Sequence, residues 1–293
     1  MSKASLIISA SPKRDYHLDL CLKALSVQNT KEVELIIVDD GSEGIAQIIS
    51  AYEKDFPQLQ YLWRANDENI SRSRNLGARH AKTENLIFLN CDVLFHPHVI
   101  SYYLYYLNHF PHATFWGYVG CRKNVFSPSL WFEKTQVNWL DFRFFPLNAS
   151  EIYVHPDIQK KPHTLAGGHH FAMQKEVFDH IGGFDETFQA WGEEDVELAL
   201  RGHLKGHPIY FLGDCWAEHV VHDYTEVFHQ RSYQELRHKL EKIMALEDMA
   251  SHLSKQLPST VFFSFERSHL FEKMQSHYLK YNPRAIQDEL RSF

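Results

Sequence analysis

The sequence predicts an α/β protein, a three-layer α/β/α sandwich built on a mostly parallel sheet. Short apolar runs rich in Ile and Val alternate with helix-like stretches through residues 5–90. Several of these runs end in polar residues, which is typical of strands that carry a ligand site at one edge of the sheet. The chain has 293 residues, 44% of them hydrophobic, and can therefore bury a full-sized core.

The first half supplies strands and helices in strict alternation. Strands are expected at 5–9, 34–39, 59–63 and 86–90, and helices near 18–27, 45–55 and 70–81. Because strands that alternate with helices run parallel, their carboxyl ends meet at one edge. The polar residues at those ends are Ser11, Asp39, Asp40 and Asp92. We expect the ligand to bind at this edge.

The second half is less regular. Beyond about residue 105 aromatic residues are frequent, as in a region that shapes a substrate site. An amphipathic helix is predicted within 228–252 from the spacing of four apolar residues, Leu236, Leu240, Ile243 and Met244. The other expected elements are helices at 175–180, 193–204 and 266–281 and a strand at 209–212.

Composition and motif content exclude several classes of protein. A net charge of -7 disfavours a protein that neutralises nucleic-acid phosphates, so no nucleic-acid partner is expected. The four cysteines form no CxxC pair, which favours a reducing, cytoplasmic location. The apolar stretch at the N-terminus is too short for a signal peptide, and prolines and histidines interrupt the uncharged stretch 93–121, so no transmembrane segment is expected. Without GxGxxG, GxxxxGK[ST] or HExxH strings, the dehydrogenase, P-loop and zinc-protease classes are set aside.

Three segments carry a resemblance to a known family. They are 34–42 (ELIIVDDGS), 69–77 (NISRSRNLG) with 88–92 (FLNCD), and 182–195 (GGFDE to AWGEED). In this order and spacing they resemble the nucleotide-sugar glycosyltransferases of the GT-A fold, chiefly family 2. The third segment also resembles the C-terminal half of galactosyl- and N-acetylgalactosaminyltransferases and of chondroitin-polymerase-type domains. The resemblance covers roughly residues 5–225.

The resemblance implies a hexosyltransferase that takes a sugar from a UDP-sugar donor, as in polysaccharide biosynthesis. Its acceptor would be a hydroxyl of a glycan, a lipid-linked or a peptide substrate. The expected domains are a GT-A domain of residues 1–227, divided at residue 105 into a nucleotide-binding half and an acceptor and donor-sugar half, and a helical extension, 228–293. Whether that extension packs on the catalytic domain, contacts a membrane surface, forms an oligomer or holds a partner stays open.

The expected nucleotide site begins at Asp39. This carboxylate ends a strand and can accept a hydrogen bond from a uracil N–H, the role that the resemblance gives it, whereas Asp40 fits a structural or ribose role. The alternative is a strand-ending turn with only local functions. By resemblance, Arg74 packs its helix against the nucleotide loops. Ser11 lies at the same edge, and Gly167 and Gly168 match a loop whose backbone approaches the donor sugar.

A divalent cation, Mn²⁺ or Mg²⁺, is expected beside the diphosphate. The string Asn90-Cys91-Asp92 occupies the place of the Asp-x-Asp metal motif, and hard cations prefer oxygen ligands. Asp92 supplies a carboxylate, while Asn90 offers an amide to a ribose hydroxyl or a metal-bound water. The resemblance places a metal-binding histidine roughly 25 residues beyond the Trp-Gly motif, which points to His219 first and His222 second.

Acidic residues open the helix predicted at 193–204. The helix dipole favours such residues, so simple helix-end electrostatics is one explanation. An inverting transferase also needs an ionised carboxylate to take the proton of the attacking hydroxyl. By resemblance Asp195 is this base, Glu194 orients the acceptor or donor sugar, and Trp191 packs on a pyranose ring. The alternatives are a retaining transferase of the same fold, a nucleotidyltransferase, and a non-catalytic nucleotide-sugar or glycan binder.

Overall fold

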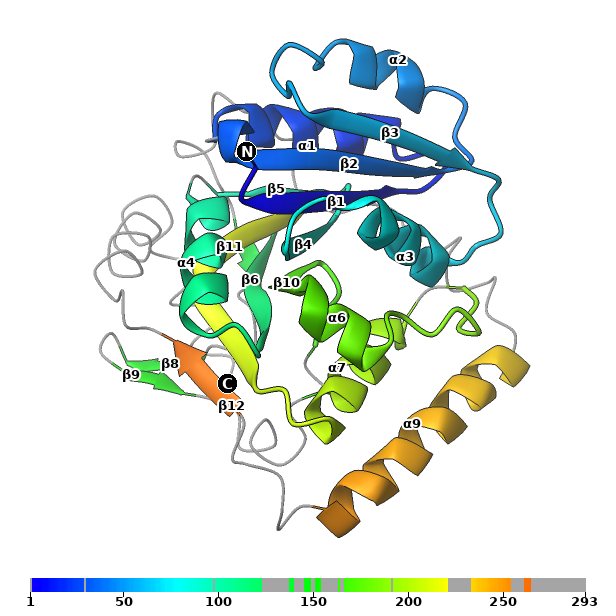
Figure 1. The fold of residues 1–293 in the computed structure, drawn as a ribbon, viewed down its shortest axis with the longest axis vertical. Coiled ribbons are helices and arrows are strands. Elements are labelled where there is room, and N and C mark those ends of the chain that lie inside the picture. Colours follow the sequence, from blue (N-terminus) through cyan, green and yellow to red (C-terminus); the bar gives the residue numbers. More distant parts are fainter. Residues whose placement is uncertain are drawn as a thin grey trace.

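A computed structural model gives the arrangement of the chain (Figure 1). It describes residues 2–28, 30–96, 98–122, 137–139, 145–148, 151–153, 163, 166–190, 192–220, 233–253 and 261–264. The strands and helices within these ranges form a sheet with helices on both faces, so the predicted three-layer α/β/α class is confirmed.

The central sheet follows the strand order β12-β11-β6-β10-β4-β1-β2-β3. Strands β1 to β4 are parallel to one another, and β10 is antiparallel to its neighbours β4 and β6, so the sheet is mostly parallel as predicted. The strands of this sheet are β1 (Ala4–Ala10), β2 (Val33–Asp40), β3 (Leu59–Arg64), β4 (Asn85–Asn90), β5 (Val93–Phe95), β6 (Thr114–Arg122), β7 (Val137–Trp139), β10 (His170–Gln174), β11 (Ile209–Val220) and β12 (Val261–Ser264). Strands β8 (Phe145–Asn148) and β9 (Glu151–Tyr153) form a separate pair.

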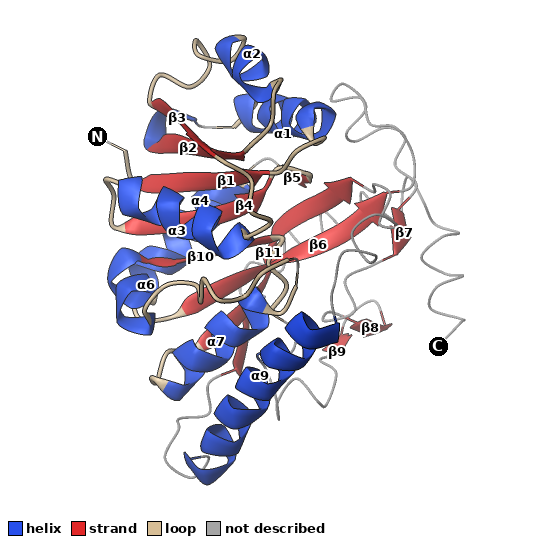
Figure 2. Ribbon diagram, turned by 90° about the vertical axis from the view of Figure 1, so that its right-hand side faces the viewer, coloured by secondary structure: helices blue, strands red, loops and turns tan. Residues whose placement is uncertain are grey.

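Two clusters of buried side chains hold helices against the two faces of the sheet. On one face lie α1 (Asp15–Ser26), α2 (Ile45–Ser50) and α4 (Val99–His109). On the other lie α3 (Ile70–His80), α6 (Lys175–Ile181) and α7 (Glu194–Leu204). The short 3-10 helix Thr30–Glu32 precedes β2. Helix α9 (Tyr233–Leu253) packs on α7, at the end of the molecule farthest from α2 (Figure 2).

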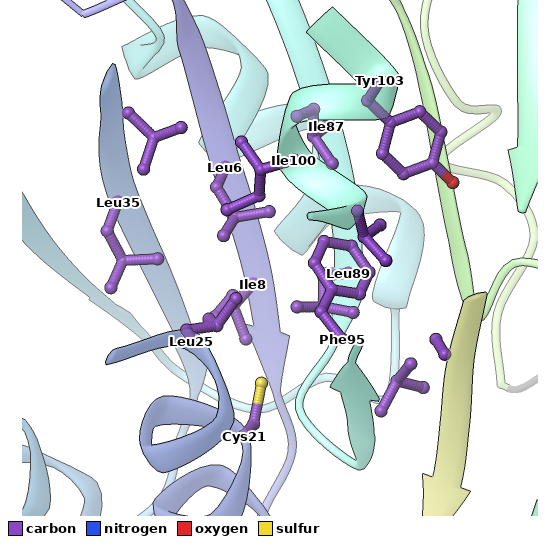
Figure 3. Close-up of a cluster of buried hydrophobic side chains, with 14 of the residues drawn as sticks. Leu6, Ile8, Cys21, Leu25, Leu35, Ile87, Leu89, Phe95, Ile100 and Tyr103 are labelled. Atoms are coloured by element: carbon purple, nitrogen blue, oxygen red, sulfur yellow. The ribbon is translucent and has the colours of Figure 1, made fainter. Parts of the chain in front are cut away.

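Coverage on both faces explains the continuous apolar runs of the central strands. Every residue of β1 and β2 is buried, as expected for parallel strands between helix layers. Alternate residues serve opposite layers: Leu35 and Ile37 join the first cluster, while Ile36 and Val38 join the second. Figure 3 shows part of the first cluster, where side chains of β1, β2 and β4 meet those of α1 and α4. The resulting rigid sheet positions the ends of its strands.

Some elements differ from the sequence-based expectations. Helix α2 ends at Ser50, and 51–55 form turns rather than a further helical turn. The region just beyond residue 105 is more regular than expected, because α4 occupies 99–109 and β6 occupies 114–122. The expected strand at 209–212 continues to Val220, with a shift in register between Leu212 and Trp216. The expected helix at 266–281 lies outside the described residues.

The predicted extension contributes α9 and an edge strand, β12, which pairs in parallel with β11. On α9 only part of the expected apolar face turns inward: Ile243 is buried, whereas Leu240 and Met244 are exposed. A lysine, Lys239, is buried instead. The division of the chain at residue 227 stays a prediction.

Two further findings concern the described residues. Cys21, Cys91 and Cys215 are buried, and none of the three forms a disulfide bond within the part of the chain that the structure describes. Among the helices of the described ranges, none combines the length and the apolar character that crossing a bilayer requires.

Candidate active site

The carboxyl ends of β1, β2 and β4 lie side by side, as the sequence predicted. In the sheet register Ala10 pairs with Asp39, and Ser9 pairs with Asn90, so Asp39 and Asn90 flank the end of β1. Ser11 follows β1 directly and is exposed. The expected ligand edge therefore brings together polar residues from three strands.

Asp39 is fully buried in this edge. Its Oδ1 accepts a hydrogen bond from the Ser42 backbone N–H at 2.8 Å, and its Oδ2 accepts from the Tyr61 hydroxyl at 2.6 Å. The first bond closes a turn at the end of β2, and such a local turn is the alternative explanation for Asp39. Burial, with the hydrogen bond to Asp39, raises the pKa of Tyr61, so the hydroxyl remains a donor. A carboxylate has about four acceptor positions, so these two bonds leave acceptor capacity.

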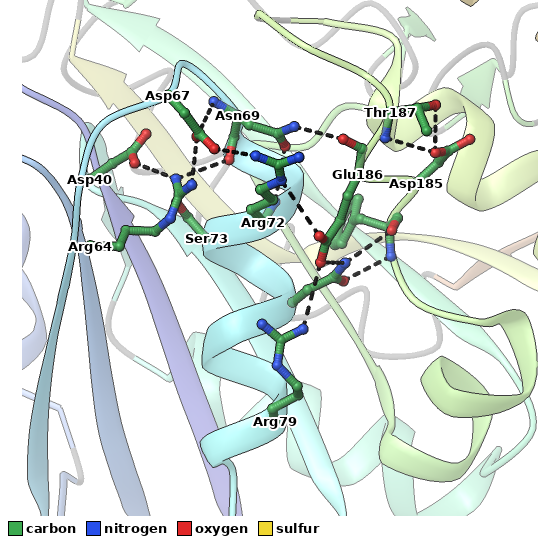
Figure 4. Close-up of polar contacts among 12 residues, drawn as sticks. Asp40, Arg64, Asp67, Asn69, Arg72, Ser73, Arg79, Asp185, Glu186 and Thr187 are labelled. Carbon is green, nitrogen blue, oxygen red and sulfur yellow. Dashed lines mark hydrogen bonds and ion pairs between the residues drawn. The ribbon is translucent and has the colours of Figure 1, made fainter.

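Asp40 takes a structural position on the opposite face of β2. It forms a buried ion pair with Arg64, whose Nη1 also donates to Ser73 Oγ at 3.2 Å (Figure 4). Burial raises the pKa of Asp40 to about 6, against the opposing effect of Arg64. Arg64 thereby ties the end of β2 to α3. Asn69 precedes helix α3 in an extended conformation and caps it, because its side chain accepts from the Arg72 backbone N–H at 3.0 Å.

The two outer arginines of α3 contact the segment that precedes α7. Arg72 Nε and Arg79 Nη1 each lie 3.6 Å from a carboxylate oxygen of Glu186 (Figure 4). Asn75 exchanges hydrogen bonds with the backbone of Phe184, both at 2.9 Å. These residues hold α3 against the 184–187 segment.

Arg74 lies at the centre of the site, 2% exposed. Its Nη1 donates to Glu194 Oε1 at 3.0 Å, and its Nη2 donates to Asn90 Oδ1 at 3.0 Å and to the Gly168 carbonyl at 2.8 Å. The guanidinium also lies over the Phe184 ring, 5.0 Å from its centroid. Arg74 thus joins α3, β4, α7 and the loop that carries Gly167 and Gly168, here called the glycine loop.

We predict that Arg74→Leu destabilises the fold by about 3–5 kcal/mol, because it leaves the buried carboxylate of Glu194 without its countercharge. Glu194 is 3% exposed, and within the described structure its Oε2 has no hydrogen-bond partner. Arg79→Leu is the matched control on the same helix, since the Arg79 side chain is 60% exposed. Urea unfolding measures both; equal midpoints for the two variants would contradict the central role of Arg74.

Asp195 lies at the start of α7, half-buried beside the glycine loop. Its Oδ2 accepts from the Gly168 N–H and its Oδ1 from the Val196 N–H, the latter at 2.8 Å. A Cβ on Gly168 would lie 2.8 Å from Asp195 Oδ2 and 2.9 Å from Arg74 Nη2, so only glycine permits this approach. Burial and the neighbouring charge of Glu194 raise the pKa of Asp195 well above the usual range, although Arg74 and the two amides oppose them.

Asp92 and His219 meet at the adjoining strand ends. Strand β5 pairs antiparallel with β11 so that Val93 faces His219, and the Val220 N–H donates to the Asp92 carbonyl at 2.8 Å. His219 Nε2 lies 3.5 Å from Asp92 Oδ2, and both residues are buried. The His169 ring stands edge-on to that of His219, with centroids 5.2 Å apart. The sheet therefore brings together two residues expected to bind metal from positions 127 residues apart.

This pair fits a divalent cation in part. A carboxylate and an imidazole suit Mn²⁺ and similar ions, and the other positions would go to diphosphate oxygens and water. Among the described residues, no group of three or more His, Cys, Asp or Glu side chains could hold a metal ion. Asn90 turns its Oδ1 to Arg74. His222 and Trp191 lie outside the described residues.

Three contacts of the site were not expected from the sequence: Tyr61 on Asp39, His169 beside His219, and Lys239 of α9 on the loop before α7. The first has a signal in the sequence, because Tyr61 shares a face with Trp63, which pairs with Asp39. His169 directly follows the glycine pair. Nothing in the sequence distinguishes Lys239 from the other lysines.

This combination of fold and site defines a class, the nucleotide-sugar glycosyltransferases. The sequence matches Glycosyl transferase family 2 over residues 15–182, and the N-terminal domain of galactosyltransferase over residues 150–230. Because the first match spans more than half of the chain, the chain belongs to glycosyltransferase family 2.

Known relatives agree with this assignment. The chain is 25% identical to validoxylamine A glucosyltransferase of Streptomyces hygroscopicus subsp. limoneus, over 75% of this chain and 52% of the relative. It is 27% identical to polypeptide N-acetylgalactosaminyltransferase 12 of Mus musculus, over 61% of this chain and 34% of the relative. The chain thus spans only a third to a half of the length of these relatives.

Solved structures show the same fold. The complex of S. aureus TarS 1-349 with UDP aligns with a TM-score of 0.60 at 16% identity, over 83% of this chain and 65% of that one. The corresponding complex with UDP-GlcNAc aligns with a TM-score of 0.59 at 16% identity, over 82% of this chain and 66% of that one. The GT-A fold expected from the sequence is confirmed by these structures.

Proposed function

We propose that this chain transfers a sugar from a UDP-sugar to a hydroxyl of an acceptor, with inversion and with a divalent cation. The observation that carries the proposal is the position of Asp195. Its carboxylate has a raised pKa, touches the glycine loop and shares Arg74 and Glu194 with the end of β4. TarS, which shares the fold, is described in complexes with UDP and UDP-GlcNAc, and this supports a UDP-sugar donor.

The uridine is proposed to bind at Asp39. An ionised carboxylate at a strand end can accept the uracil N–H while Oδ1 keeps its bond to Ser42. Because Asp39 is fully buried, uracil binding requires the Tyr61 hydroxyl or the turn after β2 to shift. Ser11, exposed beside it, is proposed to contact the same nucleotide.

The diphosphate is proposed to lie beside Asp92 and His219, with Asn90 oriented by Arg74 toward the donor. A divalent cation bound there would neutralise the charge that develops on the leaving UDP. His169 adds an imidazole next to His219 at the same place. His222 is the alternative histidine ligand. Both Mn²⁺ and Mg²⁺ suit a site in which a carboxylate and phosphate oxygens bind the same cation.

The transfer step is proposed to be a single displacement. The acceptor hydroxyl attacks the anomeric carbon as UDP leaves, and Asp195 takes the hydroxyl proton. Glu194 is fixed by Arg74 and is proposed to orient a sugar hydroxyl through Oε2, a buried atom that has no hydrogen-bond partner among the described residues. Gly167 and Gly168 line the donor-sugar side, and Trp191 is proposed to pack on a pyranose ring.

We predict that Asp39→Asn weakens UDP binding about tenfold or more, because the amide keeps an acceptor for Ser42 but presents a donor to the uracil N–H. Asp55→Asn is the control, since Asp55 is an exposed carboxylate before the amino end of β3. Calorimetry with UDP, together with melting curves, measures the effect. Wild-type affinity in a folded Asp39→Asn protein would remove Asp39 from the uridine site.

A further inference from the structure

Helix α9 contacts both loops that meet at Asp195. We propose that it is a strap and that Lys239 is a positioning residue. The lysine holds the segment before α7, residues 185–190 and 192–193, in the conformation that places Glu194 and Asp195 for transfer. This inference rests on the proposed function. It assigns a role to the helix of the predicted extension, whose function the sequence analysis left open.

The central contact of α9 is made by the buried ammonium group of Lys239. Lys239 is 3% exposed, and its Nζ donates to the carbonyls of Ala190 at 3.1 Å and Gly192 at 2.9 Å. Burying an ammonium is costly unless hydrogen-bond acceptors surround it. One side chain therefore binds the carbonyl of the residue before the Trp-Gly motif and that of the glycine within it.

The backbone that Lys239 holds has an unusual conformation. Ala190, Gly192 and Glu193 have φ angles of 56°, 98° and 70°, all in the left-handed region. For residues with a Cβ this region costs on the order of 1 kcal/mol or more, so it persists only when the surroundings impose it. Glu193 directly precedes α7, and its conformation therefore sets the direction in which Glu194 and Asp195 leave the loop.

A second lysine, one turn along α9, holds the beginning of the segment. Lys242 Nζ forms an ion pair with Asp185 and donates to Thr187 Oγ1 at 2.7 Å. The fully buried Phe188 ring lies near both lysines, 5.7 Å from Lys239 Nζ and 5.5 Å from Lys242 Nζ. Residues 185 and 187 at one end, and 190 and 192 at the other, are thus held by one helix, with the Phe188 ring near both lysines.

The far end of α9 reaches the other loop. Glu247 Oε1 lies 3.0 Å from His163 Nε2, and the His163 carbonyl accepts from the Ala166 N–H at 3.0 Å, just before the glycine pair. The Gly168 N–H in turn donates to Asp195. One helix therefore contacts the segments on both sides of that hydrogen bond.

The test replaces Lys239 by Met, which keeps most of the side-chain length and removes the charge. Arg237→Met is the matched control, because Arg237 is on the same helix, 68% exposed, and pairs only with Glu241 among the described residues. We expect Lys239→Met to lower kcat about tenfold or more, to leave UDP affinity within twofold, and to increase hydrogen exchange in 185–195. Lys239→Arg should restore part of the rate, and Arg237→Met should behave as wild type.

Lys242→Met is a second variant for the case in which Lys239→Met does not fold, since the Lys242 side chain is 35% exposed. Faster hydrogen exchange in the segment and a lower kcat in Lys242→Met would support the strap. Wild-type exchange and kcat in this variant would overturn it. Wild-type kcat and exchange in folded Lys239→Met also overturn it. If the wild-type protein transfers no sugar, the proposed function fails, and hydrogen exchange alone decides whether α9 holds the segment.

Discussion

Asp195→Asn is expected to lower kcat by about 10²-fold or more while UDP-sugar affinity stays within a few-fold of wild type. The substitution keeps the shape of the side chain and an acceptor for one of the two backbone amides, Gly168 or Val196, but it removes the group that takes the acceptor proton. Steady-state kinetics and calorimetry with the same UDP-sugar separate the two effects. Near-normal turnover in this variant would exclude Asp195 as the base.

Asp195 is also expected to determine how the transferase activity depends on pH. A base works only when deprotonated, and burial followed by the Glu194 charge raises the pKa of Asp195. Activity is therefore lost as the pH falls through this raised pKa, well above the value of about 4 usual for an aspartate. Glu194→Gln removes one cause of the shift, so the acid limb of kcat/KM should move to lower pH. An acid limb that stays at the wild-type pH would show that the Glu194 charge does not raise the pKa of the titrating group.

Chelation of divalent metal is expected to abolish transfer, and Mn²⁺ or Mg²⁺ should restore it. Asp92→Asn and His219→Gln should each weaken Mn²⁺ binding in the presence of UDP, because a pair 3.5 Å apart supplies the proposed protein ligands. Electron paramagnetic resonance of bound Mn²⁺ measures this without turnover. His112→Gln is the control, since His112 lies before β6, where its carbonyl accepts from the His207 ring. Full activity in chelator would contradict the metal assignment.

Local sequence patterns predicted the part of the site that depends on strand ends. Asp39 and Asn90 lie beside the end of β1 because parallel strands must end at one edge, and the Ile- and Val-rich runs identified those strands. The partners of Arg74 could not be predicted in this way. Gly168 and Glu194 lie 94 and 120 residues further along the chain, and only the packing of α3, α6 and α7 brings them together.

The length of β11 shows a different limit. Gly213 and Asp214 are typical turn residues, so the sequence favoured a strand that stops at 212. In the structure Gly213 and Asp214 lie within the shift in register between Leu212 and Trp216, and the strand continues through His219. Pairing with β5 then fixes the histidine beside Asp92. The sequence pointed to His219 without showing which neighbouring strand positions it, and that strand, β5, became visible only in the fold.

The most direct test of the account is the anomeric configuration of the product. Proton NMR during turnover, with a panel of UDP-sugars and candidate hydroxyl acceptors, identifies the transferred sugar and its configuration in one measurement. A base-assisted single displacement predicts a product whose configuration is opposite to that of the donor. Retained configuration, or no transfer and no hydrolysis of any UDP-sugar by metal-loaded protein, would contradict the proposal that this site is an inverting UDP-sugar transferase.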